Sequence, residues 1–74
     1  MSNPAMRPGE TSADYCRRMG WQPGTRLTGT DPLRRRTDTV TLTAIGRSVI
    51  LAEGPNGTEE IWPLKYRDWQ PAQD

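Results

Sequence analysis

The 74-residue chain has no histidine, no phenylalanine and a single cysteine, Cys16. One cysteine cannot form an internal disulfide, and without histidine or a second cysteine the sequence has no zinc-ligand set of known spacing. Histidine is also the usual general base at neutral pH and the ordinary activating partner of a cysteine nucleophile. The sequence therefore predicts a protein that is not an enzyme, with no catalytic residue, no metal and no cofactor.

Long apolar runs are missing as well. No stretch of 18 apolar residues exists, which predicts that no helix spans a membrane. Positions 1–10 also have no apolar segment of the kind that a secretory signal requires. A lone cysteine agrees with a reducing compartment. These absences favour a cytoplasmic protein without a membrane partner.

Apolar residues make up only 32% of the chain, so the core must be thin. A domain of this size buries only about 60% of the surface of its unfolded chain, and a poor core usually needs a disulfide, a metal or a partner subunit. Because the first two are missing, the composition predicts a homo-oligomer or a partner-bound subunit. The length allows one domain, which we expect over 11–71, between flexible tails at 1–10 and 72–74.

Turn signals and apolar periodicity predict one short helix followed by five short strands. The helix is expected over 12–19, from a capping arrangement at Thr11 and Asp14 to a stop at Gly20. This order is typical of a mainly β protein, a small SH3-like five-stranded barrel with one short N-terminal helix, and an oligonucleotide-binding-type barrel is the alternative. The strands are expected at 25–29, 39–45, 48–53, 58–62 and 69–71.

The predicted core comes from inward strand positions and from the tryptophans. Alternation with threonine places Val40 and Leu42 on one face of the 39–45 strand, and the 48–53 strand is apolar on both faces. Two tryptophans are expected to close the two ends of the barrel while Trp21 covers the helix, because each ring buries about 150–250 Å². The full predicted core is Leu27, Val40, Leu42, Val49, Leu51, Trp62 and Trp69.

Charge is divided unevenly along the chain. Seven arginines accompany three acidic residues up to Arg36, whereas three basic residues accompany six acidic ones beyond it. Arginine binds phosphate and carboxylate groups bidentately, so the run Arg34, Arg35 and Arg36 is a candidate contact for a nucleotide, a nucleic-acid backbone or an acidic protein surface. A solvated loop in an arginine-rich composition is the alternative interpretation, because short basic runs are weak motifs.

A second candidate contact lies near the end of the chain. Tyr66 and Arg67, with Trp69, come closest to the interleaved aromatic and basic residues that nucleic-acid readers use. The alternative is a structural role, in which Arg67 and Asp68 form a local ion pair. The arginine run has a further expected counterpart in a second subunit, which is the acidic set Glu53, Glu59 and Glu60.

Several short motifs together resemble a known family. They are Cys16 with Gly20-Trp21, the runs Leu-Thr-Ala-Ile-Gly at 42–46, Ile-Leu-Ala at 50–52 and Glu-Ile-Trp-Pro-Leu at 60–64, and Arg67-Asp68-Trp69. The set is similar to a family of small uncharacterised proteins encoded by bacteriophages and prophages of actinobacteria. That family has no established activity, so the resemblance implies an origin but no site residues.

A phage origin favours a particular class of function. Small early phage proteins that are not enzymes often bind and disable a component of the host. The resemblance thus implies an inhibitor or adaptor in the host cytoplasm that acts by stoichiometric binding to a host protein or defence complex, or that sequesters a nucleotide signal. A nucleic-acid-binding accessory barrel and a structural connector of the virion are the alternatives.

Overall fold

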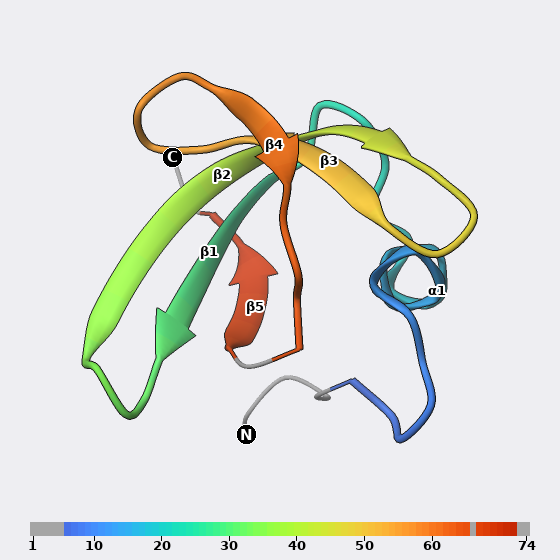
Figure 1. The fold of residues 1–74 in the computed structure, drawn as a ribbon, viewed down its shortest axis with the longest axis horizontal. Coiled ribbons are helices and arrows are strands. Elements are labelled where there is room, and N and C mark those ends of the chain that lie inside the picture. The colour runs from blue at the N-terminus through green and yellow to red at the C-terminus, as the bar shows by residue number, and fades with distance from the viewer. Residues whose placement is uncertain (1–5, 66, 73–74) are drawn as a thin grey trace.

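The computed structural model describes residues 6–65 and 67–72, and the predicted helix and five predicted strands are all present there (Figure 1). The mainly β class is therefore confirmed. Each pair of neighbouring strands is antiparallel, in the order β4-β3-β2-β1-β5, and among the described residues no pairing closes the sheet between β4 and β5. The elements are α1 (Ser12–Met19), β1 (Arg26–Asp31), β2 (Arg36–Ile45), β3 (Ile50–Glu53), β4 (Glu59–Ile61) and β5 (Asp68–Pro71).

Helix α1 begins and ends where the sequence indicates. The Thr11 hydroxyl accepts a hydrogen bond from the Asp14 backbone N–H at 3.1 Å, which satisfies one of the donors left open at a helix start. Gly20 takes the left-handed conformation (φ 78°), and its N–H donates back to the last turn. Directly after it, Trp21 lies edge to face with Tyr15 at 5.2 Å between ring centroids. This indole covers the helix as expected.

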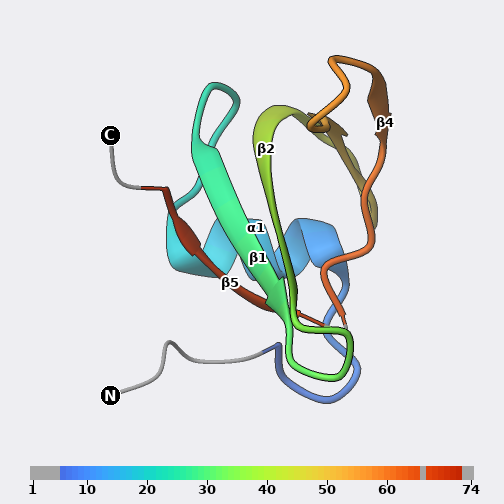
Figure 2. The same cartoon turned by 90° about the vertical axis from the view of Figure 1, so that its left-hand side faces the viewer.

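Helix α1 lies across one side of the curled sheet (Figure 2). The Ser12 hydroxyl accepts a hydrogen bond from the Leu64 N–H at 3.2 Å, in the connection between β4 and β5. The Ala13 N–H donates to the Ser48 carbonyl at 3.3 Å, in the turn between β2 and β3. The helix therefore joins two turns that lie far apart in the sequence and covers the side that the strands leave open.

The segment before the helix differs from the tail predicted at 1–10, of which positions 1–5 lie outside the described residues. The Glu10 carboxylate accepts hydrogen bonds from the Arg18 guanidinium at 2.7 and 2.8 Å and from the Arg7 backbone N–H at 2.9 Å. These charge-assisted bonds lower the pKa of Glu10 from 4.5 to about 2. Residues 6–10 are therefore tied to α1.

The core lies between α1 and the inner face of the sheet. Among the residues expected there, four are at most 1% exposed: Leu27, Val40, Leu42 and Trp69. Helix α1 adds three buried side chains to them, which are Ala13, Tyr15 and Cys16. The rest of the buried cluster is Trp21, Ile50, Ala52 and Leu64.

The prediction for the strand at 48–53 is wrong about which of its faces is buried. Val49 is 45% exposed and Leu51 is half-buried, whereas Ile50 and Ala52 are fully buried. Because buried Leu42 lies opposite Ala52 in the register, the two-residue period of a strand turns Ile50 inward and Leu51 outward. A strand with four apolar residues in a row does not reveal this choice in its own sequence.

Two glycines make room for the tryptophans, which do not close opposite ends of a barrel as predicted. Gly29 lies opposite Trp69 in the β1–β5 register, and a Cβ on Gly29 would lie 2.6 Å from the indole. A Cβ on Gly54 would lie 2.9 Å from the ring of Trp62. The two indoles instead meet edge to face, with their centroids 6.2 Å apart, so they form one cluster.

A methyl group on Gly29 is expected to displace Trp69. Gly29→Ala should lower the free energy of unfolding by about 2 kcal/mol, since overpacking a core costs about 1–3 kcal/mol. Thr30→Ala is the control on the opposite face of β1, where only the Oγ contact with Thr37 at 3.2 Å is lost, and should cost under about 1 kcal/mol. Urea unfolding measures both variants, and equal midpoints would contradict the close packing at Gly29.

Candidate functional site

The hairpin between β1 and β2 ends in a tight turn over 32–35, which projects at the lower left of Figure 1. The turn is shorter than the connection left between the strands expected at 25–29 and 39–45, because Asp31 and Arg36 already pair as strand residues. The Asp31 carboxylate accepts hydrogen bonds from the backbone N–H groups of Leu33 at 3.0 Å and Arg34 at 3.3 Å. This side chain fixes the shape of the turn.

Three side chains of this turn stand in solvent, and we call Leu33, Arg34 and Arg35 the basic tip. Leu33 is 94% exposed. Arg34 and Arg35 are exposed as well, and the Nε of Arg34 lies 3.9 Å from the Asp31 carboxylate, a long contact for a side chain that is 84% exposed. The basic tip therefore offers one apolar group beside two cationic groups.

The backbone of Arg35 is in a conformation that arginine rarely adopts. Its φ is 53°, in the left-handed region, and it is the only non-glycine residue with a positive φ among the described residues. The Cβ of an L-residue makes this region unfavourable, by about 1–2 kcal/mol. Strain of this kind is concentrated at functional sites, which makes the basic tip a candidate contact.

The other predicted contact residues lie away from the tip. Tyr66 lies outside the described residues. Arg67 donates from Nη1 to the Asp38 carboxylate at 2.7 Å, and Arg36 approaches the same oxygen with its Nε at 3.1 Å. The guanidinium of Arg67 also lies over the ring of Trp62, 5.8 Å from its centroid. Asp38 therefore brings Arg36 and Arg67 together, whereas Arg34 makes only its long contact with Asp31 and Arg35 is exposed at the tip.

Asp38 is the residue that the sequence analysis missed. It is 9% exposed and lies on the inner face of β2. The hydrogen bond from Arg67, reinforced by Arg36, lowers the pKa of Asp38 below its ordinary value. The sequence does contain a signal for Asp38. The alternation that places Val40 and Leu42 inward also places Asp38 inward if the strand expected at 39–45 begins at least one residue earlier. Arg67 therefore pairs with Asp38 on β2, while its predicted partner was Asp68.

The described side chains offer little for covalent chemistry. The Cys16 thiol is fully buried, and burial raises its pKa to about 11, so it is protonated at neutral pH and a poor nucleophile. Among residues 6–65 and 67–72, no three His, Cys, Asp or Glu side chains gather as a metal site requires. The exposed groups of the basic tip are the guanidinium groups of Arg34 and Arg35 and the side chain of Leu33.

Fold and sequence together define a small β-rich domain built on one five-stranded antiparallel sheet. Residues 10–74 match a family described as a domain of unknown function, DUF7241, and the chain belongs to that family. No curated protein and no solved structure matches the chain. Within the described part of the chain, no helix has the length and apolarity needed to cross a bilayer.

The pair between Asp38 and Arg67 is expected to make stability depend on pH. Asp38→Asn should lower the free energy of unfolding at pH 7 by about 2 kcal/mol, because the Arg67 charge, 20% exposed, loses its counter-charge. The folded-state pKa of Asp38 lies below its ordinary value of 3.8. The stabilisation is therefore complete above that value and disappears as the pH falls through the folded-state pKa.

The difference in the free energy of unfolding between the parent and the Asp38→Asn variant should therefore disappear at low pH. Urea unfolding from pH 7 down to pH 2 measures this difference. Asp14→Asn is the matched control, since Asp14 and Arg17 pair at 3.2 Å with both side chains at least half exposed, and such pairs contribute under about 1 kcal/mol. A loss for Asp38→Asn no larger than that of the control at pH 7 would refute the structural role of the pair.

Replacing Arg35 should stabilise the protein. Glycine adopts a φ of 53° without the steric cost of a Cβ, but it loses more conformational entropy than arginine when the chain folds. The net effect of Arg35→Gly should be a rise of about 0.5–1 kcal/mol in the free energy of unfolding. Arg34 does not have a positive φ, so Arg34→Gly, which removes the same charge, should destabilise. Thermal unfolding distinguishes the two, and a loss of stability in both variants would show that Arg35 is unstrained.

Proposed function

We propose that this protein is a non-enzymatic binding module that attaches to a protein partner through the basic tip. The observation that supports this proposal is the 94% exposure of Leu33 on a turn that is fixed by Asp31, beside the exposed Arg34 and Arg35. Burying a leucine in a partner's pocket is worth about 1.5–3 kcal/mol. Arginine is among the residues most often found at the centre of interfaces.

The arginines give the contact its direction. Arg34 and Arg35 can pair with carboxylates at the rim of an apolar pocket, and such charges contribute more to the association rate and the register than to net affinity. Asp31 holds the turn before any partner arrives, which reduces the ordering cost of binding. The expected partner surface is a small apolar pocket with an acidic rim.

A nucleic-acid partner is the second interpretation of the basic tip, and the aromatic residues argue against it. Proteins that bind single strands stack bases on exposed aromatic rings. Tyr15, Trp21 and Trp69 are buried and Trp62 is partly covered, so the described residues offer no aromatic platform beside the tip. An exposed leucine also has no role against a phosphate backbone. A protein partner fits the exposed groups better.

The proposal includes the origin and role that the resemblance implies. We infer that the protein is encoded by a phage and acts in the host cytoplasm as an inhibitor or adaptor, by stoichiometric binding to a host protein or defence complex. The protonated Cys16 and a protruding turn with exposed Leu33, Arg34 and Arg35 support a stoichiometric role. Sequestering a nucleotide signal is less well supported, because the tip protrudes and does not enclose a ligand.

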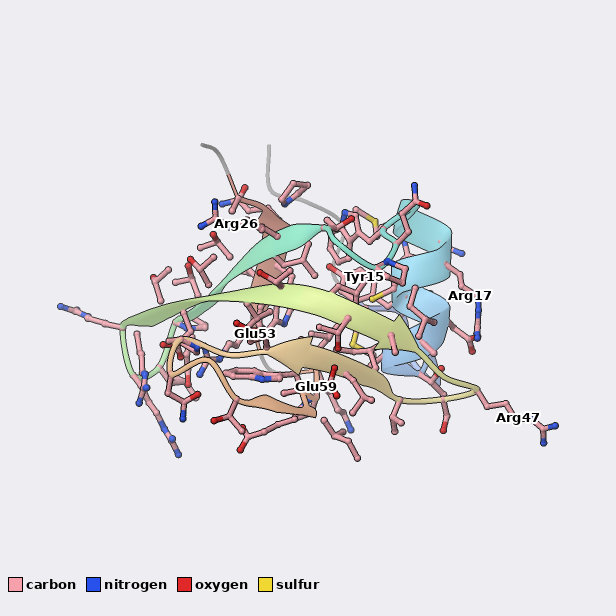
Figure 3. All side chains as sticks on the ribbon, turned by 90° about the horizontal axis from the view of Figure 1, so that it is seen from above. Tyr15, Arg17, Arg26, Arg47, Glu53 and Glu59 are labelled. Atoms are coloured by element: carbon pink, nitrogen blue, oxygen red, sulfur yellow. The ribbon has the colours of Figure 1, made fainter. Side chains whose placement is uncertain are left out.

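The test is capture of a partner from host lysate with tip variants, followed by measurement of Kd with the captured protein. Leu33→Ser should weaken binding about 10- to 100-fold, which corresponds to the burial of one leucine. Arg34→Glu with Arg35→Glu should weaken it further. Arg47→Glu is the control, since Arg47 is exposed at the end of the molecule opposite this hairpin (Figure 3), and should bind like the parent.

The alternatives give different results. A nucleic-acid partner would be insensitive to Leu33→Ser, and its affinity would fall steeply with salt in proportion to the phosphates contacted. A virion connector would be found in purified phage particles. Partner binding that is unaffected by both tip variants would refute the proposed contact surface.

A further inference from the structure

The outer face of β3 and β4 exposes apolar side chains that nothing in the described chain covers. Ile61 is 60% exposed and lies opposite Leu51 in the β3–β4 register. Val49, 45% exposed, precedes β3 beside them. In a chain with only 32% apolar residues, an exposed Ile61 beside a half-buried Leu51 is a candidate contact.

Two carboxylates lie next to this apolar pair. Glu53 and Glu59 are directly opposite each other in the same register, both exposed, and are labelled side by side on the two strands in Figure 3. Like charges in this position destabilise a strand pair. No ion pair to either carboxylate is found within residues 6–65 and 67–72, so an incoming cation would relieve their repulsion. We call Leu51, Glu53, Glu59 and Ile61 the acidic face.

We propose that the acidic face receives the basic tip of a second copy of this chain. The two surfaces match in composition: Leu33 lies beside Arg34 and Arg35 on the tip, and Ile61 with Leu51 lies beside two glutamates on the face. Charge complementarity selects a tip over another acidic face, because pairing carboxylates with carboxylates costs free energy. The inference goes beyond the proposed function, because the partner is the chain itself.

The position of the two surfaces excludes a contact within one molecule. The tip lies at the bottom and β4 at the top of both Figure 1 and Figure 2, which share their vertical axis. A tip therefore reaches an acidic face only in another copy. The contact joins two different surfaces, so it is head to tail and extends into a chain or closes into a ring, in contrast to a twofold dimer.

Edge pairing of β4 with itself is disfavoured by the same charges. The strand has only three residues, Glu59 to Ile61, and an antiparallel pair centred on Glu60 would place this carboxylate opposite its copy. Head-to-tail assembly avoids that repulsion. It also occupies the basic tip, so assembly and binding of another protein at the tip compete with each other.

Blocking one surface at a time tests this arrangement. The tip-blocked variant carries Arg34→Glu and Arg35→Glu, and the face-blocked variant carries Glu53→Lys and Glu59→Lys. Sedimentation of the parent at about 50 mM salt, where surface charges are weakly screened, should show concentration-dependent assembly. Each blocked variant alone should be monomeric, and an equal mixture should assemble again in a 1:1 ratio, because the intact tip meets the intact face and the two charge-reversed surfaces are also opposite in sign.

The control variant carries Arg47→Glu and Asp14→Lys, which change exposed charges elsewhere and should leave assembly as in the parent. Leu33→Ser, which keeps every charge, should reduce assembly about 10-fold or more. Far-UV circular dichroism checks that each variant is folded. A parent that stays monomeric at 100 µM, or blocked variants that fail to combine on mixing, would overturn the inference, as would a blocked variant that still self-associates.

The outcome can be separated from that of the proposed function. The face-blocked variant keeps its tip, so it should capture a host partner at least as well as the parent. Capture without assembly overturns only the inference made here, and assembly without any captured partner overturns only the proposed function.

Discussion

The ion pair between Asp38 and Arg67 beneath two indoles is the contact on which the sheet depends. It links the inner face of β2 to the segment that leads into β5, and so holds the last strand beside the first. Arg67 fills space that a richer core would fill with aliphatic groups, since its guanidinium lies within 6.0 Å of the centroids of both Trp62 and Trp69. A partly buried charge is stable only when it is fully paired, and Asp38 supplies the charge.

The same pair determines what the hairpin can present. Arg36, whose side chain is 68% exposed, pairs with Asp38 at the base of the turn, so the predicted run of three arginines is divided into one residue paired with Asp38 and two at the tip. Asp31 shapes the turn from the other strand. The hairpin base is fixed by these contacts, and the turn with the strained Arg35 exposes Leu33 to solvent. A flexible loop would lose more conformational entropy when a partner binds it.

How much of this could be predicted depends on the range of the interactions. Helix α1 was predicted to the residue, because Thr11, Asp14 and Gly20 act locally on the backbone. The five strands were predicted from alternation and turn residues. The buried face of β3 was not, because it is set by the Ala52–Leu42 pairing between strands. The meeting of Trp62 and Trp69 was also missed, since it depends on Gly29 and Gly54 from two other segments.

The candidate site divides in the same way. The solvated loop around Arg34 and Arg35 could be expected from its charged residues, whereas the inward turn of Arg67 required knowing that Asp38 faces the core. Once that pair is recognised, the uneven distribution of charge along the chain can be related to positions on the surface of the domain. The cations at the hairpin tip make only the long contact between Arg34 and Asp31, and no ion pair to Glu53 or Glu59 is found among the described residues. Each group lies beside an exposed aliphatic side chain. Leu33 buries almost none of its surface where it stands and Ile61 only part of its own. The two proposed contacts, a partner at the basic tip and a second copy at the acidic face, would bury both side chains.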